Sequence, residues 1–371
     1  MNNTFKSIIS TAIAIVLTLG FTNFAFADNF ETNKFIDEKQ KIFKPIIEQI
    51  YNDYGELYDF KNFEFKTYNF AKGDNNYIGI DVFVDMTLTR HPEDNPYFKG
   101  ELDALKKINN NDSLKSFLEK EISERIRDIE NEYYQVPNRT TFTYAYKLDT
   151  LKENKMNLKN DYSIEDYYYI VGDEEKTLLE ADKLNKIEDK SVSYEKGYKE
   201  LLNSTKEILL DKNRMTSFRG NTSYDRIKAR DWALDNALKE QEYPSKEVQG
   251  TDCANFVSKS LRAGGIPEDK PGEWYGSSYW GGWSGKNWLR TGNGTDGGVV
   301  PYMTNRGYFA LESNESSVSA GCIMNWLNTS HVALVTYGDG TTIKYTQHGA
   351  HPSKDTVYRS SDVKAEFYKY Q

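Results

Sequence analysis

A short block at residues 250–258, Gly-Thr-Asp-Cys-Ala-Asn-Phe-Val-Ser, narrows the possible structures of this chain more than any other segment. A polar side chain at 251 or 252 suits a helix N-cap, apolar residues recur at helical spacing as far as Leu261, and glycines at 264–265 predict the helix end. Cys253 then lies in the first turn, on the buried edge of the helix. Because the helix dipole and the first-turn amides favour a thiolate over a thiol, the block predicts a nucleophilic cysteine.

The alternative for Cys253 is a structural role, because cysteines are often buried and two cysteines can form a disulfide. A bond to Cys322, the other cysteine of the chain, would remove the nucleophile. We therefore expect Cys322 to be buried and unpaired.

A cysteine nucleophile needs a base, and three of the four histidines follow Cys253 in the chain: His331, His348 and His351. His331 opens a segment with strand-like alternation, which makes it the expected base. His351 is expected in a loop. His91, in an Arg-His-Pro-Glu-Asp turn far upstream, is expected to have no catalytic part.

The third catalytic group depends on the turn of a hairpin predicted over 331–348. A two-residue turn at 339–340 pairs His348 with His331 on one face of the sheet, where His348 orients the imidazole. A three-residue turn pairs Gln347 with His331 instead, which makes the Gln347 amide the alternative for that role.

These residues predict acyl transfer through a thioester. The Cys253 thiolate attacks an amide carbonyl, His331 protonates the leaving amine, and the same histidine activates the water that hydrolyses the thioester. The backbone amide of Cys253 is the expected oxyanion donor.

Four motifs, YDRIKARDWA, DCANFVSKSLRAGG, HVALVT and YTQH, lie within residues 224–265 and 319–350. They resemble the bacterial putative amidase domain family, which is related to the NlpC and CHAP cysteine peptidases. The resemblance implies an α+β, papain-like C-terminal domain, with Cys253 at the nucleophile position and His331 at the base position. Where relatives often have Gly-Asp before the histidine strand, this chain has Gly321 and Cys322.

Residues 1–27 have the pattern of a signal peptide: Lys6, an apolar run over 8–19, and a small-residue Ala-Phe-Ala site before Asp28. An uncleaved anchor is the alternative, but the apolar run is short for a membrane span. We expect a secreted protein, associated with the cell wall, that meets the membrane only through this peptide.

The length of the mature chain predicts two domains. Residues 28–210 are expected to form a separate small α+β domain of unknown role, and the polar segment 211–222 is the expected linker to a catalytic domain at 223–371. Within 28–210 the expected helices are 33–54, 112–133 and most of 173–210, and the expected strands are 63–70, 77–90, 140–148 and 162–171.

Charge and motifs argue against several functional classes. The net charge of −9 lies entirely in residues 1–215, because acidic and basic residues balance in 216–371. The sequence has no basic patch, zinc-type spacing, phosphate loop or dinucleotide turn, and 293–298 lacks calcium-ligand spacing. We therefore expect no cofactor, no metal and no nucleic acid partner.

Four of the six tryptophans, Trp274, Trp280, Trp283 and Trp288, lie among glycines between the nucleophile and the base. Trp280 and Trp283 are expected either to wall a substrate cleft or to fill the core, and Trp288 is expected in the core.

An exported bacterial cysteine amidase meets one abundant amide polymer, peptidoglycan, so a cell-wall hydrolase is the leading hypothesis. An acyltransferase or a protease acting on proteins is the enzymatic alternative, because an amine can resolve the same thioester. A catalytically silent wall-binding or adhesion module is the third possibility, and the presence of Cys253 and His331 argues against it.

Overall fold

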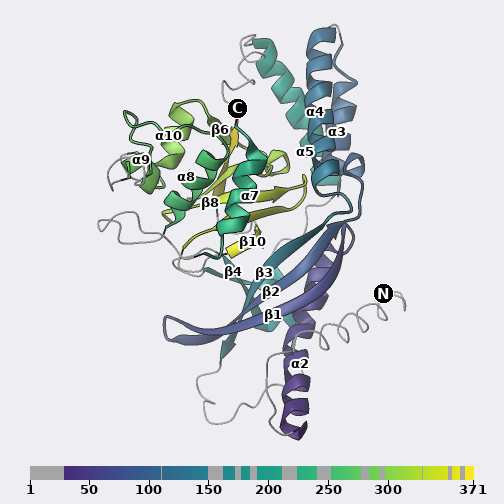
Figure 1. Ribbon diagram of the computed structural model, residues 1–371. Coiled ribbons are helices and arrows are strands. Elements are labelled where there is room, and N and C mark those ends of the chain that lie inside the picture. Colours follow the sequence, from purple (N-terminus) through teal and green to yellow (C-terminus); the bar gives the residue numbers. More distant parts are fainter. Residues whose placement is uncertain are drawn as a thin grey trace. The chain divides into compact units, whose positions relative to one another are not determined.

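The structure of the chain is a computed structural model (Figure 1). It describes residues 29–109, 111–148, 162–171, 177–183, 190–210, 224–239, 252–276, 284–292, 297–327, 329–349, 353–359 and 364–371, with only the backbone for 29–40, 177, 207 and 210. The expected signal peptide at 1–27 and the expected linker at 211–222 lie outside these residues.

The chain forms two compact units. Unit 1 comprises Met1–Thr89 and Gln135–Lys186, and unit 2 comprises Arg90–Tyr134 and Ile187–Gln371. Both units mix helices and strands. The expected domain boundary at 211–222 stays a prediction, as does the papain-like topology of the C-terminal part.

Unit 1 is built on antiparallel strands and one long helix. The strands are β1 (Tyr58–Lys72), β2 (Asn75–Leu88), β3 (Pro137–Leu148), β4 (Tyr167–Val171) and β5 (Thr177–Glu180), paired in that order. Alternate residues of β2 are fully buried, and helix α2 (Asn29–Tyr54) packs on β1 and β3 through rings such as Tyr51 on Phe60 and Tyr54 on Phe142. Helix α2 and the β1–β2 hairpin confirm the expected elements. The expected strand at 162–171 is shorter than predicted, because it begins only at Tyr167, after a 3-10 turn.

The expectation of a mostly helical 173–210 is wrong at its start. Residues 177–180 form β5, which pairs with β4, and the helix begins only at Lys190. A strand of four residues is too short for alternation to reveal it, because its conformation depends on the neighbouring strand.

Unit 2 contains a run of antiparallel strands, with helices packed on it. The strands are β6 (Phe309–Glu312), β7 (Ile323–Trp326), β8 (His331–Gly338), β9 (Ile343–Gln347), β10 (Ser353–Val357) and β11 (Ala365–Tyr370), in the spatial order β10-β9-β8-β7-β11-β6. The helices of this part are α7 (Arg226–Asn236), α8 (Cys253–Ala263), α9 (Lys286–Leu289) and α10 (Val299–Asn305).

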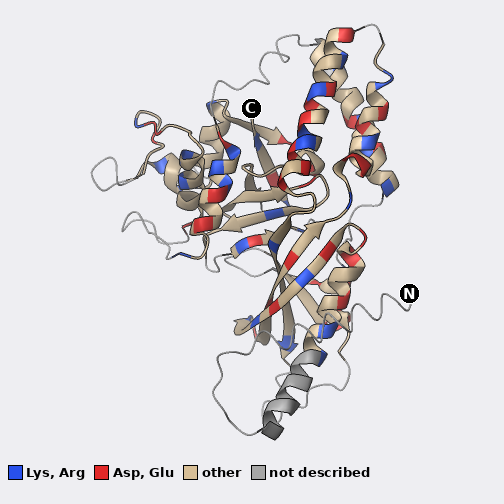
Figure 2. Ribbon diagram, turned by 45° about the vertical axis from the view of Figure 1, so that its right-hand side comes forward, with Lys and Arg blue, Asp and Glu red and all other residues tan. Residues whose placement is uncertain are grey.

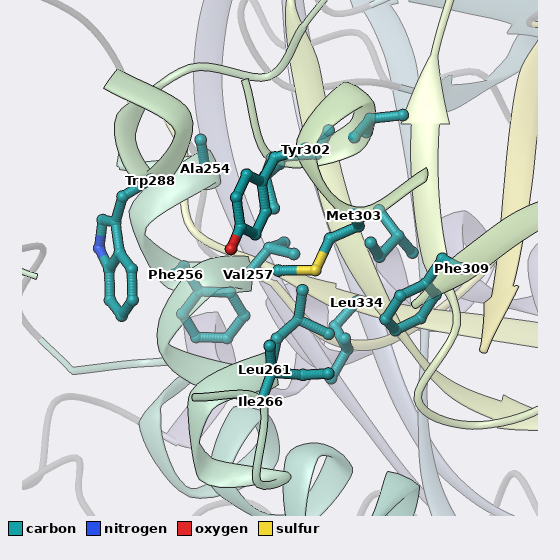
Figure 3. Close-up of a cluster of buried hydrophobic side chains, with 14 of the residues drawn as sticks. Ala254, Phe256, Val257, Leu261, Ile266, Trp288, Tyr302, Met303, Phe309 and Leu334 are labelled. Carbon is teal, nitrogen blue, oxygen red and sulfur yellow. The ribbon is translucent and has the colours of Figure 1, made fainter. Parts of the chain in front are cut away.

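The core of this sheet lies under α8. Phe256, Val257 and Leu261, spaced along one side of α8, meet Leu334 of β8 and Met303 of α10 in one buried cluster (Figure 3). The apolar residues whose spacing predicted the helix are therefore the ones that pack α8 against the sheet. Since a helix held along its length is fixed at both ends, this packing also positions Cys253.

Unit 2 also includes α3 (Pro96–Leu105), α4 (Asp112–Glu132) and α5 (Lys190–Leu210), along which both signs of charge alternate (Figure 2). Helices α3 and α5 approach closely, since a Cβ on Gly100 would lie 2.1 Å from the Tyr194 carbonyl oxygen. Short 3-10 turns occur at Pro92–Asp94 and Glu315–Ser317 in unit 2, and at Ile164–Asp166 and Ala181–Lys183 in unit 1.

Candidate active site

Cys253 is the first residue of α8 and is only 3% exposed. The helix ends at Ala263, and Gly265 takes a left-handed conformation with φ +102°, which a residue with a Cβ adopts at a cost. The predicted start and end of the helix are therefore confirmed. Asp252 occupies the N-cap position, but its carboxylate makes no capping bond.

The carboxylate of Asp252 binds other side chains instead. Its Oδ1 accepts a hydrogen bond from Asn255 Nδ2 at 2.7 Å, and its Oδ2 lies 2.9 Å from His348 Nδ1. Asn255 Oδ1 in turn accepts from the indole Nε1 of Trp288 at 2.7 Å. These hydrogen bonds connect the start of α8 to His348, the residue after β9, and to Trp288 of α9.

His331 is the first residue of β8 and is buried, with the ring of Trp326 packed against its imidazole at 4.9 Å. Its Nε2 lies 2.8 Å from Gln347 Oε1. Because an amide oxygen only accepts, Nε2 carries the ring proton, and this tautomer leaves Nδ1 as the basic nitrogen. Gln347 thus fixes both the orientation and the tautomer of the expected base.

The hairpin between β8 and β9 differs from both predicted registers. Gly338 pairs with Ile343, so residues 339–342 form a longer connection, and the pairing shifts between Val335 and Tyr337. The Asp339 carboxylate accepts hydrogen bonds from the backbone amides of Thr341 and Thr342 at 3.0 and 2.8 Å, which closes this wider turn. Neither the two-residue turn nor the three-residue turn is present.

This register separates Gln347 from His348. Leu334 pairs with Thr346, so one position further along Gln347 lies opposite Ala333, on the same face as His331. His348 comes next and points to the other face, where its ring stacks on Phe256 of α8 at 4.3 Å. The structure therefore brings Gln347, and not His348, into hydrogen-bonding contact with His331.

The two expected catalytic residues lie at the same end of the sheet. Helix α8 packs against β8, and the bond from Asp252 to His348 holds the start of α8 beside the end of β9. Since β9 runs antiparallel to β8, the end of β9 is also where β8 begins. Cys253 and His331, the first residues of α8 and β8, are thus placed at one edge by the fold itself.

Sequence reasoning treated Asp252 only as a possible cap and did not single out Asn255. The signal was present in the Asp-Cys-Ala-Asn run, because residues three apart on a helix lie on one side of it. Trp288 is buried as expected. Trp280 and Trp283 lie outside the described residues, as does His351.

The remaining candidate groups lie apart from these contacts. Cys322 is fully buried and has a free thiol, as expected, and burial raises its pKa. His91 accepts a hydrogen bond from the Glu93 amide and lies near Glu130. In the described ranges, no group of three or more His, Cys, Asp or Glu is arranged to hold a metal ion. None of the helices described there is long and apolar enough to cross a bilayer.

Comparison with known proteins gives one match. Searches of curated proteins and of solved structures found nothing similar. Residues 223–370 match the family model described as a putative amidase domain. This segment contains α8, β8 and β9, and so it includes Cys253, His331, Gln347 and His348. The match supports an amidase-like domain over residues 223–370.

Proposed function

We propose that residues 223–370 hydrolyse amide bonds with Cys253 as the nucleophile and His331 as the base. The observation that carries this proposal is the placement of both residues at one end of the sheet, with His331 Nε2 held by Gln347 Oε1 at 2.8 Å. Nucleophile, base and orienting group are the three parts that covalent acyl transfer requires.

The reaction follows from the protonation states that these contacts favour. Cys253 transfers its proton to His331 Nδ1, and the thiolate attacks the amide carbonyl carbon. The imidazolium then protonates the departing amine as the carbon–nitrogen bond breaks and a thioester remains. A water molecule, losing its proton to His331, attacks the thioester, and the acid leaves as the thiolate reforms. The Cys253 amide, at the positive end of α8, stabilises the oxyanion.

The orienting role belongs to Gln347 in this proposal. An imidazole held through Nε2 keeps Nδ1 directed along a fixed line, so the base does not lose rotational freedom at each turnover. His348 is a poorer candidate, because its own ring nitrogens contact Asp252 and the Asn236 carbonyl oxygen.

We further propose that the substrate is the peptide part of peptidoglycan, that residues 1–27 direct export, and that the catalytic domain shares the papain-like fold of the NlpC and CHAP peptidases. Export would bring a cysteine amidase to the wall, whose stems and cross-bridges are amide polymers. No cofactor or metal takes part in the steps above.

The test is mass spectrometry of purified muropeptides before and after incubation with residues 28–371. We expect pairs of products whose summed mass exceeds that of the substrate by one water, one carrying a new carboxyl group and the other a new amino group. Cys253→Ala should abolish the products, whereas Cys322→Ala, the matched control at the other cysteine, should keep most of them. Equal product formation by wild type and Cys253→Ala would refute the cysteine mechanism, and a mass gain from an added amine would indicate acyl transfer.

A further inference from the structure

We propose that His348 is a positioning residue that acts as a fixed positive charge: an imidazolium that bridges Asp252 and the Asn236 carbonyl and cancels the negative charge of Asp252 beside the nucleophile. This inference rests on the proposed role of Cys253. It gives His348 a task different from orienting His331.

Both ring nitrogens of His348 face hydrogen-bond acceptors. Nδ1 lies 2.9 Å from Asp252 Oδ2, and Nε2 lies 2.9 Å from the backbone oxygen of Asn236, at the end of α7. A carbonyl oxygen cannot donate, so Nε2 carries a proton in every arrangement. A neutral imidazole would then have to accept at Nδ1, from a carboxyl group that had kept its own proton.

The second proton belongs on the ring rather than on Asp252. The other oxygen of Asp252 accepts a hydrogen bond from Asn255 Nδ2, which favours the ionised carboxylate. The pair is therefore an imidazolium and a carboxylate, with side chains only 6% and 2% exposed.

Because the pair of Asp252 and His348 is buried, its net charge affects the formation of the Cys253 thiolate. Water screens the charge of Asp252 poorly at such low exposure, and Asp252 directly precedes the residue that must become a thiolate. An uncompensated carboxylate there would favour the neutral thiol. With His348 charged, the pair has no net charge and the helix dipole acts on the thiolate without opposition.

The other groups around His348 leave this balance in place. Phe256 of α8 covers one face of the ring and carries no charge. Asp235, on α7, precedes Asn236, and Lys239, three residues after Asn236, donates to Asn236 Oδ1 at 3.0 Å. His331 and Gln347 lie on the other face of the sheet. Cys253 directly follows Asp252 in the chain.

A charge cycle at residues 252 and 348 tests the proposal without any amide substrate. In a Cys322→Ala background, the rate of Cys253 alkylation by iodoacetamide is followed from pH 5 to 10. His348→Gln keeps a donor but removes the charge, and it should raise the pH midpoint of alkylation by about one unit. The double variant His348→Gln/Asp252→Asn restores a neutral pair and should return the midpoint to that of the parent.

A purely structural role for His348 predicts a different pattern, in which the double variant is at least as impaired as the single one. That result, or an unchanged midpoint in His348→Gln, overturns the proposal. Nitrogen NMR of the wild-type protein measures the protonation of the His348 ring directly, and so this test does not depend on whether a variant folds. Both ring nitrogens of His348 should carry a proton at pH 7, and a single proton overturns the proposal. Either outcome leaves hydrolysis by Cys253 to be judged separately from muropeptide products.

Discussion

At the scale of single residues, the same side chain has two different surroundings in this chain. Cys253 begins a helix at the edge of the sheet where His331 and Gln347 meet, whereas Cys322 lies fully buried and burial raises the pKa of its thiol. The sequence predicted the first environment from the local signals of a helix start. It predicted the second because a bond to Cys322 would remove the nucleophile. It left Gln347 and His348 as alternatives, because that choice depends on a hydrogen bond across two strands.

The Gln347 amide is expected to raise kcat by holding the His331 ring. Gln347→Ala removes the acceptor that holds His331 Nε2, so kcat should fall by about 10²-fold with little change in KM. Gln347→Glu keeps an acceptor oxygen in the same position and should retain much more activity. Steady-state kinetics on a peptide amide substrate measure both. Wild-type kinetics in Gln347→Ala would show that the imidazole needs no orienting partner.

At the scale of elements, local patterns predicted the helices and strands better than their partners. The β8–β9 hairpin was expected, and its strands formed almost where expected. Its register was predicted wrongly, because the turn also contacts α3: Asn95 Nδ2 donates to Thr341 Oγ1 at 3.0 Å. A residue 246 positions away in sequence thus helps to set the turn length, and no local propensity carries that information.

Strand β9 also carries a buried cation that links stability to pH. Lys344 has no exposed surface, its Nζ lies 4.0 Å above the Tyr337 ring, and burial lowers its pKa to about 8, partly opposed by Asp355 and Asp339. Below pH 8 both the folded and the unfolded chain hold this proton, and the folded state bears the full cost of the buried charge. Between about 8 and the unfolded value near 10.4, only the unfolded chain holds it, so stability rises with pH.

The stability advantage of Lys344→Met over wild type should therefore be largest below pH 8. Urea denaturation at pH 7 and at pH 9.5 compares the free energies of unfolding of the two proteins. The free energy of unfolding of Lys344→Met should exceed that of wild type by less at pH 9.5 than at pH 7. A difference that stays constant across this range would mean that the Lys344 ammonium is not disfavoured by folding.

At the scale of the whole molecule, the folded unit around the site is larger than the segment that matches the amidase family. The Tyr133 ring packs on Tyr337 at 4.1 Å, and Arg226 pairs with Asp128 and Glu132 of α4. Arg125 of α4 makes two bonds to the Glu101 carboxylate, at 2.7 and 2.8 Å. Periodicity cannot reveal such contacts between distant segments, and so the sequence alone grouped α3, α4 and α5 with residues 28–210.

A truncated chain tests this larger unit. Residues 217–371 keep the elements proposed to be catalytic. They lose Tyr133, which packs on Tyr337, and the Asp128 and Glu132 carboxylates that pair with Arg226. Because each buried aromatic contributes about 1.5–3 kcal/mol, this chain should unfold at a clearly lower temperature than residues 28–371 or fail to stay soluble. A chain that joins 90–134 to 187–371 through a flexible linker should recover most of the loss. Equal melting temperatures for 217–371 and 28–371 would show that these helices are dispensable.

We propose that Cys253, activated by His331, is the reactive group of this protein. Iodoacetamide labelling of the wild-type chain between pH 6 and 9 tests this role, with peptide mapping to measure the labelling of each cysteine separately. We expect Cys253 to react at least about 10-fold faster than Cys322 at pH 7. His331→Ala should move the pH midpoint of Cys253 labelling toward the value of about 8.5 for a free thiol. Faster labelling of Cys322, or a Cys253 profile that His331→Ala leaves unchanged, would contradict it.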